Sequence, residues 1–404
     1  MSSILGGKKI LIGVTAGIAA YKTASLVRLF IKSGAEVKVV MTPVAKDFVT
    51  PLTLSTLSKN PVHSSFYNEE DENAEWNNHV ELGLWADLMV IAPATANTLS
   101  KMSTGNSDNL LLATYLSAKC PVYFAPAMDL DMYNHPSTHE TFKKLQDFGN
   151  IMIPAESGEL ASGLVGQGRM AEPSTIVRFM EDDILGKLPL RGQKVLITAG
   201  PTYESIDPVR FIGNHSSGKM GIELAKSAAN LGAQVTLVLG PSSLNVAHDF
   251  ITVVPVVSAA SMYEAVTKEF DACDIAIASA AVADYRPKNI SDQKIKKSDS
   301  SFSIELERTT DILKWMGSVK KNQFLVGFAL ETENEEENAK NKLKKKNLDL
   351  IVLNSLNDKG AGFKGQTNKV TLINHKFEIK AFELKTKTEV AQDIFNEIKE
   401  LRNV

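Results

Sequence analysis

The chain has 404 residues, enough for two or three domains that each bury their own core. Its 44% hydrophobic and 23% charged residues are ordinary for a globular protein, and a formal net charge of −3 gives no general attraction to nucleic acid or membranes. No apolar run approaches a membrane span, no secretory signal pattern opens the chain, and Cys120 and Cys273 form no metal-ligand spacing. We therefore expect a cytoplasmic protein without a structural disulfide.

The first half opens with a strand–turn–helix–strand pattern. Ile10–Val14 is a continuous apolar run, typical of a strand buried on both faces of a parallel sheet. The small residues Thr15–Gly17 lead into a helix with apolar residues at helical spacing, which ends at Gly34. Glu36–Met41 then predicts the returning strand. This unit is typical of a doubly wound α/β domain.

The same pattern begins again at Gln193. Strand Val195–Thr198 is followed by a longer glycine-rich loop, a helix from about Lys219 to Gly232, and a strand over Gln234–Leu239. We infer a shared architecture rather than a proven duplication, because parallel sheets repeat such patterns for physical reasons. The predicted fold is α/β, with two doubly wound Rossmann-like domains.

The turn residues around Pro189 interrupt the periodicity between the halves. They predict one domain over 1–187, a linker over 188–192 and a second domain over 193–404. The second domain departs from a plain repeat at its end, where an antiparallel hairpin turns at Asn374–His375 before a closing amphipathic helix.

Small and hydroxyl-bearing residues follow four predicted strands of the first half. In doubly wound sheets, ligands bind at these carboxyl ends, and hydroxyls beside a helix N-terminus can hold a phosphate. No glycine triplet of the dinucleotide type follows the first strand, so a mononucleotide such as FMN fits better than NAD. Tight packing alone could explain any one of these turns, but not all four: Thr15–Gly17, Thr42–Pro43, Ala92–Asn97 and Ala125–Asp129.

Longer motifs carry a family resemblance. The first half resembles the flavin-dependent cysteine decarboxylases in GIAAYK (17–22), NHVELGLWADLMVIAPATANTLSKMSTGNSDNLL (78–111), PAM (126–128) and GLVGQGRM (163–170). The second half resembles phosphopantothenate–cysteine ligases in ITAGPTYESIDPVRFIGNHSSGKMG (197–221), AAVADYRP (280–287) and KIKK (294–297). The whole chain is therefore similar to the bifunctional phosphopantothenoylcysteine decarboxylase/phosphopantothenate–cysteine ligase family of bacterial coenzyme A synthesis. The first domain is then expected to be flavodoxin-like.

The resemblance implies an FMN-dependent decarboxylation in the first half. In this family, FMN takes a hydride from the sulfur-bearing carbon, the carboxylate leaves as CO₂, and the resulting ene-thiolate is reduced and protonated. His79 matches the family's catalytic histidine, although a lone histidine is more often a surface or capping residue. The FMN-binding candidates are Thr15, Gly17, Thr42, Thr95, Asn97, Ser107 and Asn109.

Two residues of the expected decarboxylase site depart from the family pattern. Asp129 replaces an asparagine, and an ionised aspartate can only accept hydrogen bonds. Ser162 replaces the cysteine that protonates the ene-thiolate, and a serine is a much weaker acid than a thiol. Either Glu159, Asp129 or His79 delivers the proton instead, or the reaction stops at an ene-thiol.

The resemblance implies that CTP and Mg²⁺ activate 4′-phosphopantothenate in the second half, giving an acyl-cytidylate that the amine of cysteine attacks. The small-residue loop 213–221 suits a phosphate but is not a P-loop. Asn214 and Lys294 match the residues expected to act on the acyl-cytidylate. No Mg²⁺ ligands are identified. The nucleotide-binding candidates are Ala280, Asp284, Lys294, Thr310, Asp311, Ile312, Phe328, Lys342 and Lys346.

The resemblance also implies a homo-oligomer, in which decarboxylase trimers and ligase dimers close into a dodecamer. Its partners are the small molecules 4′-phosphopantothenate, cysteine and CTP, with no nucleic acid or membrane. One alternative is a decarboxylase acting on C-terminal cysteines of peptides, and another is a regulatory FMN-binding protein without catalysis. An NAD-dependent reductase or epimerase is a third alternative, but it lacks the glycine fingerprint.

Overall fold

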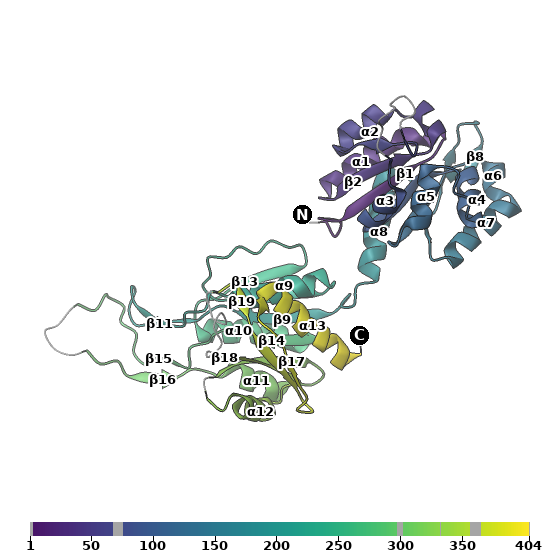
Figure 1. Ribbon diagram of the computed structural model, residues 1–404. Coiled ribbons are helices and arrows are strands. Elements are labelled where there is room, and N and C mark those ends of the chain that lie inside the picture. Colours follow the sequence, from purple (N-terminus) through teal and green to yellow (C-terminus); the bar gives the residue numbers. More distant parts are fainter. Residues whose placement is uncertain (1–2, 68–75, 297–301, 332, 356–364, 404) are drawn as a thin grey trace. The chain divides into compact units, whose positions relative to one another are not determined.

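The computed structural model describes residues 3–67, 76–296, 302–331, 333–355 and 365–403, and it divides into two compact units, Ser2–Gly186 and Lys187–Val404. Each unit has its own sheet and its own buried cores (Figure 1). Within the described ranges, no helix has the length and apolar character needed to cross a bilayer.

The first unit is built on a six-stranded parallel sheet. Its strand order is β3-β2-β1-β4-β5-β6, so the chain reverses direction across the sheet between β1 and β4. This reversal is a switch point of the kind at which doubly wound sheets bind ligands. The strands are β1 (Lys9–Val14), β2 (Glu36–Met41), β3 (Val62–His63), β4 (Leu88–Ala94), β5 (Val122–Pro126) and β6 (Ile151–Met152).

Helices cover both faces of this sheet, which explains why β1 and β4 are apolar along nearly their whole length. One core contains side chains from α1, α2 and α8, and the other contains side chains from α3, α4, α5 and α7. The helices are α1 (Thr23–Lys32), α2 (Pro51–Ser58), α3 (His79–Trp85), α4 (Ala96–Thr104), α5 (Leu110–Ser117), α6 (Leu130–Asn134), α7 (Pro136–Asp147) and α8 (Pro173–Gly186). Short 3₁₀ turns lie at η1 (Ile18–Lys22) and η2 (Pro43–Asp47).

The second unit repeats the same order of parallel strands. Its sheet runs β13-β12-β9-β14-β17-β18-β20-β21, and the first six strands are parallel with a switch point between β9 and β14. The predicted doubly wound fold of both halves is therefore confirmed. These strands are β9 (Lys194–Ala199), β12 (Gln234–Leu239), β13 (Ile251–Pro255), β14 (Ile275–Ala278), β17 (Phe324–Glu331), β18 (Leu350–Ser355), β20 (Val370–Asn374) and β21 (Ile379–Ala381).

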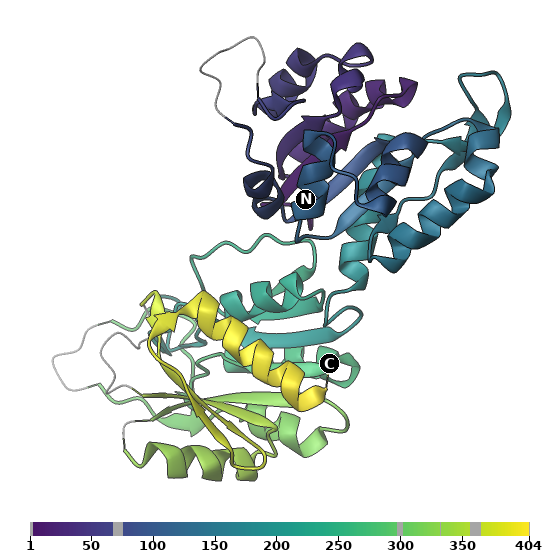
Figure 2. The same cartoon turned by 45° about the vertical axis from the view of Figure 1, so that its right-hand side comes forward.

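The predicted C-terminal hairpin is also present, because β20 and β21 are antiparallel and follow β18 at the edge of the sheet. Helix α13, yellow in Figure 2, packs beside α9 in one core, and α10, α11 and α12 contribute to the other. These helices are α9 (Lys219–Asn230), α10 (Ala259–Glu269), α11 (Ile312–Val319), α12 (Glu335–Lys345) and α13 (Lys387–Arg402), with a 3₁₀ turn at η3 (Phe270–Ala272).

Two-stranded antiparallel ribbons accompany the main sheets. In the first unit, β7 (Glu156–Glu159) pairs with β8 (Val165–Arg169). In the second unit, Figure 1 shows strands β11, β15 and β16 extending from one side of the sheet. The ribbons of the second unit are β10 (Tyr203–Ser205) with β11 (Phe211–Gly213), β15 (Tyr285–Pro287) with β16 (Leu306–Arg308), and β19 (Thr367–Asn368) with β22 (Lys385–Thr386).

The segment predicted as a linker, 188–192, packs on the second unit. Leu190 is fully buried in a core of that unit, and its amide donates to the carbonyl of Leu231 at 2.9 Å. The turn-forming residues around Pro189 predicted a break between the two domains. They did not indicate that the Leu190 side chain fixes this segment to the second unit.

Candidate functional site

A cavity of about 1040 Å³ opens at the carboxyl ends of the strands in the first unit. Its volume lies near the upper end of the roughly 300–1,000 Å³ typical of small-molecule sites. The sequence-predicted residues that line it are Gly17, Thr42, Thr95, Asn97, Asn109, Asp129 and Ser162. Residues between Asp108 and Met170 contribute much of the remaining wall, so segments far apart in the sequence meet here.

Thr15 lies at the switch point without lining the cavity. Its hydroxyl donates to the carbonyl of Pro93 at 2.7 Å and accepts from the amide of Thr95 at 3.2 Å. Because Thr15 is fully buried, its effect on a ligand passes through Thr95. The predicted FMN contact of Thr15 is thus placed one residue behind the cavity wall.

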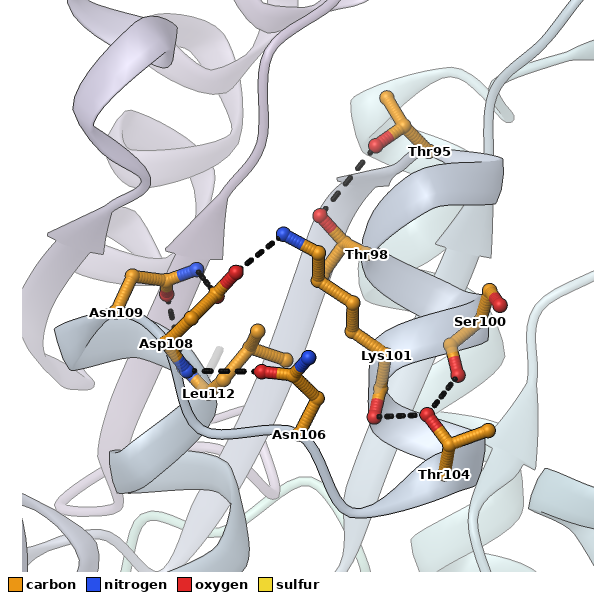
Figure 3. A network of polar contacts seen from close by, with 9 residues as sticks. All are labelled: Thr95, Thr98, Ser100, Lys101, Thr104, Asn106, Asp108, Asn109 and Leu112. Carbon is orange, nitrogen blue, oxygen red and sulfur yellow. Dashed lines mark hydrogen bonds and ion pairs between the residues drawn. The ribbon is translucent and has the colours of Figure 1, made fainter.

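Two helices begin at the cavity wall (Figure 3). Thr95 is the N-cap of α4, and Asn109 caps α5 by accepting from the amide of Leu112 at 3.1 Å. Lys101 reaches across and pairs with Asp108 at 2.6 Å. Helix N-termini with hydroxyl and amide side chains favour an anionic group, so this wall suits the phosphate of a mononucleotide. Ser107, also predicted, is exposed and does not line the cavity.

Thr42 supplies an independent test of whether a polar cofactor fits. Thr42 lines the cavity, and its hydroxyl is buried with no hydrogen-bond partner among the described residues. Burying an unpaired hydroxyl is costly, and a ligand atom in the cavity would remove that cost. The polar wall and this free hydroxyl therefore fit a flavin mononucleotide.

The β7–β8 hairpin brings Ser162 to Asp129. The amide of Met128 donates to the carbonyl of Gly168 at 3.0 Å, which attaches β8 to the loop before α6. Gly168 has a φ of +138°, and an added Cβ would lie 2.5 Å from the carbonyl oxygen of Met128. At the tip, the Ser162 hydroxyl donates to Asp129 Oδ1 at 2.8 Å. The two departures from the family pattern are therefore hydrogen-bonded partners.

Three basic residues of the cavity wall were not predicted from sequence, and each already has an acidic partner. Lys22 pairs with Glu172 at 2.8 Å, and Arg169 pairs with the same carboxylate at 2.8 Å. The hydrogen bond from Lys22 lowers the pKa of Glu172 below its usual value. Lys101 has its partner in Asp108. By contrast, no ion pair to Asp129 or Glu159 occurs among the described residues.

His79 begins α3, as predicted, but within one chain it does not line the cavity. Its ring makes an edge contact with Phe66 at 6.0 Å between centroids. Its Nδ1 is buried and has no hydrogen-bond partner in the described part of the chain. The catalytic role of His79 stays a prediction.

The switch point of the second unit gathers Thr198, Ala280 and Asn214. The amide of Ala280 donates to the Thr198 hydroxyl at 3.4 Å, and Ala281 pairs with the segment after β9. The side-chain amide of Asn214 donates to the carbonyl of Ala281 at 3.0 Å. Asn214 thus lies beside the predicted nucleotide contact Ala280.

A second group of predicted residues meets where α11 and α12 pack on β17. Lys346 pairs with Asp311 at 2.7 Å, and Lys342 donates to the carbonyl of Phe328 at 2.8 Å. Burial lowers the pKa of Lys342 from its ordinary 10.5, and the nearby Lys346 lowers it further. Lys342 and Lys346 therefore pack against neighbouring elements, although other charged residues of α12 are exposed. Ile312 is buried at the start of α11.

The remaining predicted residues of the second half are exposed. The backbone carbonyl of Asp284 accepts from the amide of Thr309 at 3.0 Å, next to the exposed Thr310. Within the described part of the chain, Lys294 forms no hydrogen bond or ion pair with the residues of either group, and Lys297 of the same motif lies outside the described residues. Among the residues that the structure describes, no cluster of three acidic, histidine or cysteine side chains is arranged to hold a metal ion.

Comparisons with known proteins match both halves. A family model described as flavoprotein matches residues 2–185, and one described as DNA/pantothenate metabolism flavoprotein C-terminal domain matches residues 190–401. The chain is 56% identical over 355 residues to a cysteine/cysteine sulfinic acid decarboxylase from an unknown prokaryotic organism, covering 87% of this chain and 98% of that protein.

Another relative matches the chain almost from end to end. The coenzyme A biosynthesis bifunctional protein CoaBC of Bacillus subtilis (strain 168) is 44% identical over 400 residues, covering 98% of this chain and 97% of that protein. The solved C-terminal domain of a coenzyme A biosynthesis bifunctional protein CoaBC aligns at 46% identity with a TM-score of 0.46, covering 54% of this chain and 99% of that chain.

Proposed function

The chain belongs to the family of coenzyme A biosynthesis bifunctional proteins, and on this premise we propose that it catalyses two consecutive reactions. The second unit joins 4′-phosphopantothenate to cysteine with CTP and Mg²⁺, and the first unit decarboxylates the resulting phosphopantothenoylcysteine with FMN. The observation that carries this proposal is that a cavity lined by seven predicted residues opens at the switch point of the first unit, while Asn214 and Ala280 lie at the switch point of the second.

In the first unit, bound FMN supplies the hydride chemistry that makes the carboxylate a leaving group. The chain's own residues would hold it: the N-termini of α4 and α5 at the phosphate, and Thr42 with its free hydroxyl. Ser162 and Asp129 are hydrogen-bonded to each other and both line the cavity, so they are the groups proposed to deliver the proton. In its acid form, Asp129 would pass a proton through Ser162 to the substrate carbon, which a serine alone does poorly.

In the second unit, the amide of Asn214 and the ammonium groups of Lys342 and Lys294 are the groups proposed to bind the activated acyl phosphate. Fixed donors and cations stabilise the charge that develops when an amine attacks such a group. Ala280, Phe328 and the Asp311–Lys346 pair are the residues proposed to contact the nucleotide. The Mg²⁺ ligands are proposed to come mainly from the nucleotide phosphates and water.

Oligomerisation is proposed to complete the first site. Hydrophobic residues at the cavity wall, including Ile18, Tyr21 and Val44, are exposed, and so are Val80 and Leu84 on the His79 helix. Such exposed apolar side chains favour burial against another copy of the chain. A trimer of this unit would bring His79 of a second copy to the cavity, and dimers of the other unit would extend the assembly to a dodecamer in the cytoplasm.

A second candidate substrate is free cysteine or cysteine sulfinic acid. The relative at 56% identity bears that activity in its name, and a carboxylate at position 129 can accept from a substrate ammonium group that an acylated cysteine lacks. Under this candidate, Asp129 acts as an ionised anchor rather than as a proton source.

One experiment separates these possibilities. The purified full chain is given 4′-phosphopantothenate, cysteine and either CTP or ATP, and pyrophosphate, CO₂ and 4′-phosphopantetheine are measured. Pyrophosphate and 4′-phosphopantetheine formed with CTP support the main proposal. CO₂ from cysteine alone supports the second candidate, and flavin binding with neither product rules out both.

A further inference from the structure

The turn between β10 and β11 contains a buried carboxylate, Asp207, that lies outside all the groups considered so far. Its Oδ1 accepts from the amides of Val209 and Arg210, both at 2.9 Å. Its Oδ2 accepts from Nε and Nη2 of the Arg210 guanidinium. The hydrogen bonds from Arg210 hold the pKa of Asp207 far below its usual value, so the pair is ionised at neutral pH.

This ion pair reaches a segment more than eighty residues further along the chain. The amide of Ile295 donates to Asp207 Oδ2 at 3.2 Å, and Arg210 Nη2 donates to the carbonyl of Ile295 at 2.9 Å. The amide of Ser291 also donates to the carbonyl of Ile206 at 3.0 Å. Both backbone polar groups of Ile295 are therefore held by the Asp207–Arg210 pair, and the residue before it is Lys294.

The same hairpin also positions Asn214. Strand β11 ends at Gly213, and the next residue donates its amide to Ala281 at the switch point. At the base of the hairpin, the buried Glu204 accepts from the amide of Ala259 at 2.7 Å, which fixes the ribbon to the start of α10. One rigid ribbon thus carries Asn214 at one end and holds the backbone beside Lys294 at the other.

We propose that Asp207 is a positioning residue of the ligase: through Arg210 it fixes the backbone at Ile295, so that Lys294 and Asn214 share one support. This inference rests on the proposed role of Lys294 in ligation. A lysine on an unanchored segment must lose backbone and side-chain freedom each time it engages the substrate, whereas an anchored backbone has already lost part of it.

The test uses the full chain with Asp207→Asn, Lys294→Gln and the double variant. Asp207→Asn keeps the shape and the Oδ1 acceptor but removes the charge that pairs with Arg210. Glu305→Gln is the matched control, because it removes the exposed Lys288–Glu305 ion pair at 2.7 Å in the same connection without touching Ile295. CO₂ release from phosphopantothenoylcysteine by the other unit serves as an internal measure of intact protein.

Asp207→Asn is expected to lower kcat of ligation by roughly 10–100-fold, as small misplacements of a catalytic group do. The KM for cysteine should change little in this variant. The Ile295 amide should exchange its hydrogen with solvent faster than in the wild type, as measured by hydrogen–deuterium exchange. The double variant should be no slower than Lys294→Gln, because both changes remove one contribution. Glu305→Gln and the release of CO₂ should be unaffected.

Wild-type ligation by Asp207→Asn would overturn the proposal, as would a double variant in which the two losses multiply. Full activity of Lys294→Gln would instead remove the proposed role of that lysine, and the positioning role with it, while leaving the ligase assignment intact. If the wild-type chain shows no ligation of 4′-phosphopantothenate to cysteine, the proposed function itself is wrong. If Asp207→Asn does not fold, Arg210→Lys replaces it, since lysine keeps the charge but loses the guanidinium fork that holds Ile295.

Discussion

The Ser162 hydroxyl donates to Asp129 Oδ1 across 2.8 Å, so the two residues expected from the resemblance to stand in place of a cysteine and an asparagine form one hydrogen-bonded unit. If this unit delivers the proton, Asp129→Asn should slow 4′-phosphopantetheine formation by roughly 100-fold and let an ene-thiol accumulate. The Asp129→Asn, Ser162→Cys double variant, which restores the family pair, should recover most of the rate. Mass spectrometry of the products measures both effects.

The same variants discriminate the second candidate. If Asp129 anchors an ammonium group, Asp129→Asn should abolish CO₂ release from free cysteine while leaving phosphopantothenoylcysteine turnover intact. A double variant no faster than Asp129→Asn alone would contradict the proton-delivery role.

Gly168 is predicted to be required for the attachment of the β7–β8 hairpin. Gly168→Ala places a Cβ at 2.5 Å from the Met128 carbonyl oxygen at a φ of +138°, so β8 must move away from the Asp129 loop. Decarboxylation should fall more than about 10-fold, because Ser162 loses its position, whereas ligation is unchanged. Gly163→Ala is the control: its φ is +82°, but an added Cβ has no atom within 4 Å. Equal losses in both variants would point to backbone strain rather than displacement.

Thr42→Val is expected to weaken FMN binding about 2–10-fold, the range that one hydrogen bond typically supplies. Thr42→Ser should bind FMN nearly as well as the wild type. Flavin fluorescence titration measures the dissociation constant. Thr114→Val is the matched control, since Thr114 is buried in α5 and its hydroxyl donates to Leu110 within the helix. Unchanged FMN affinity of Thr42→Val would contradict the predicted contact.

Lys342→Met should separate binding from stability. Because the pKa of Lys342 is lowered in the fold, its protonated form costs stability below that pKa, and the cost disappears as the pH rises through it toward 10.5. We therefore expect the variant to unfold about 2–4 °C higher than the wild type at neutral pH, with a difference that narrows in alkaline buffer. CTP binding should be lost. Lys340→Met, which removes the exposed partner of Glu336, should change neither. A difference that widens with pH would contradict this explanation.

The sequence predicts the parallel strands and their ends well, because buried parallel strands are continuous apolar runs and ligands bind where they stop. Thr42 and Thr95 follow from that rule and line the cavity, whereas Asn109, which also lines it, was expected only from the family resemblance. Lys22 was missed because a lysine in a helical pattern usually indicates solvent. Its side chain is only 6% exposed, since Glu172, 150 residues later, supplies its partner.

Contacts between residues far apart in the sequence also explain why the sequence alone does not reveal the support beside Lys294 in the second half. Asp207 and Arg210 stand three residues apart, a spacing that indicates a local ion pair, and nothing in it points to Ile295. The prediction for His79 depends on its motif alone. Within one chain His79 lies at the start of α3 and does not line the cavity.

The outermost strand of the second sheet, β21, leaves the three residues Ile379–Ala381 exposed. An open strand edge can pair with the same edge of another molecule and start fibrous aggregation. Lys380, at the middle of this strand, is held by Glu397 and Glu400 of α13, so a fixed charge stands on the edge. The charge at Lys380 therefore opposes pairing at this edge, and a neutral residue of high β propensity at position 380 is expected to make the strand prone to aggregation.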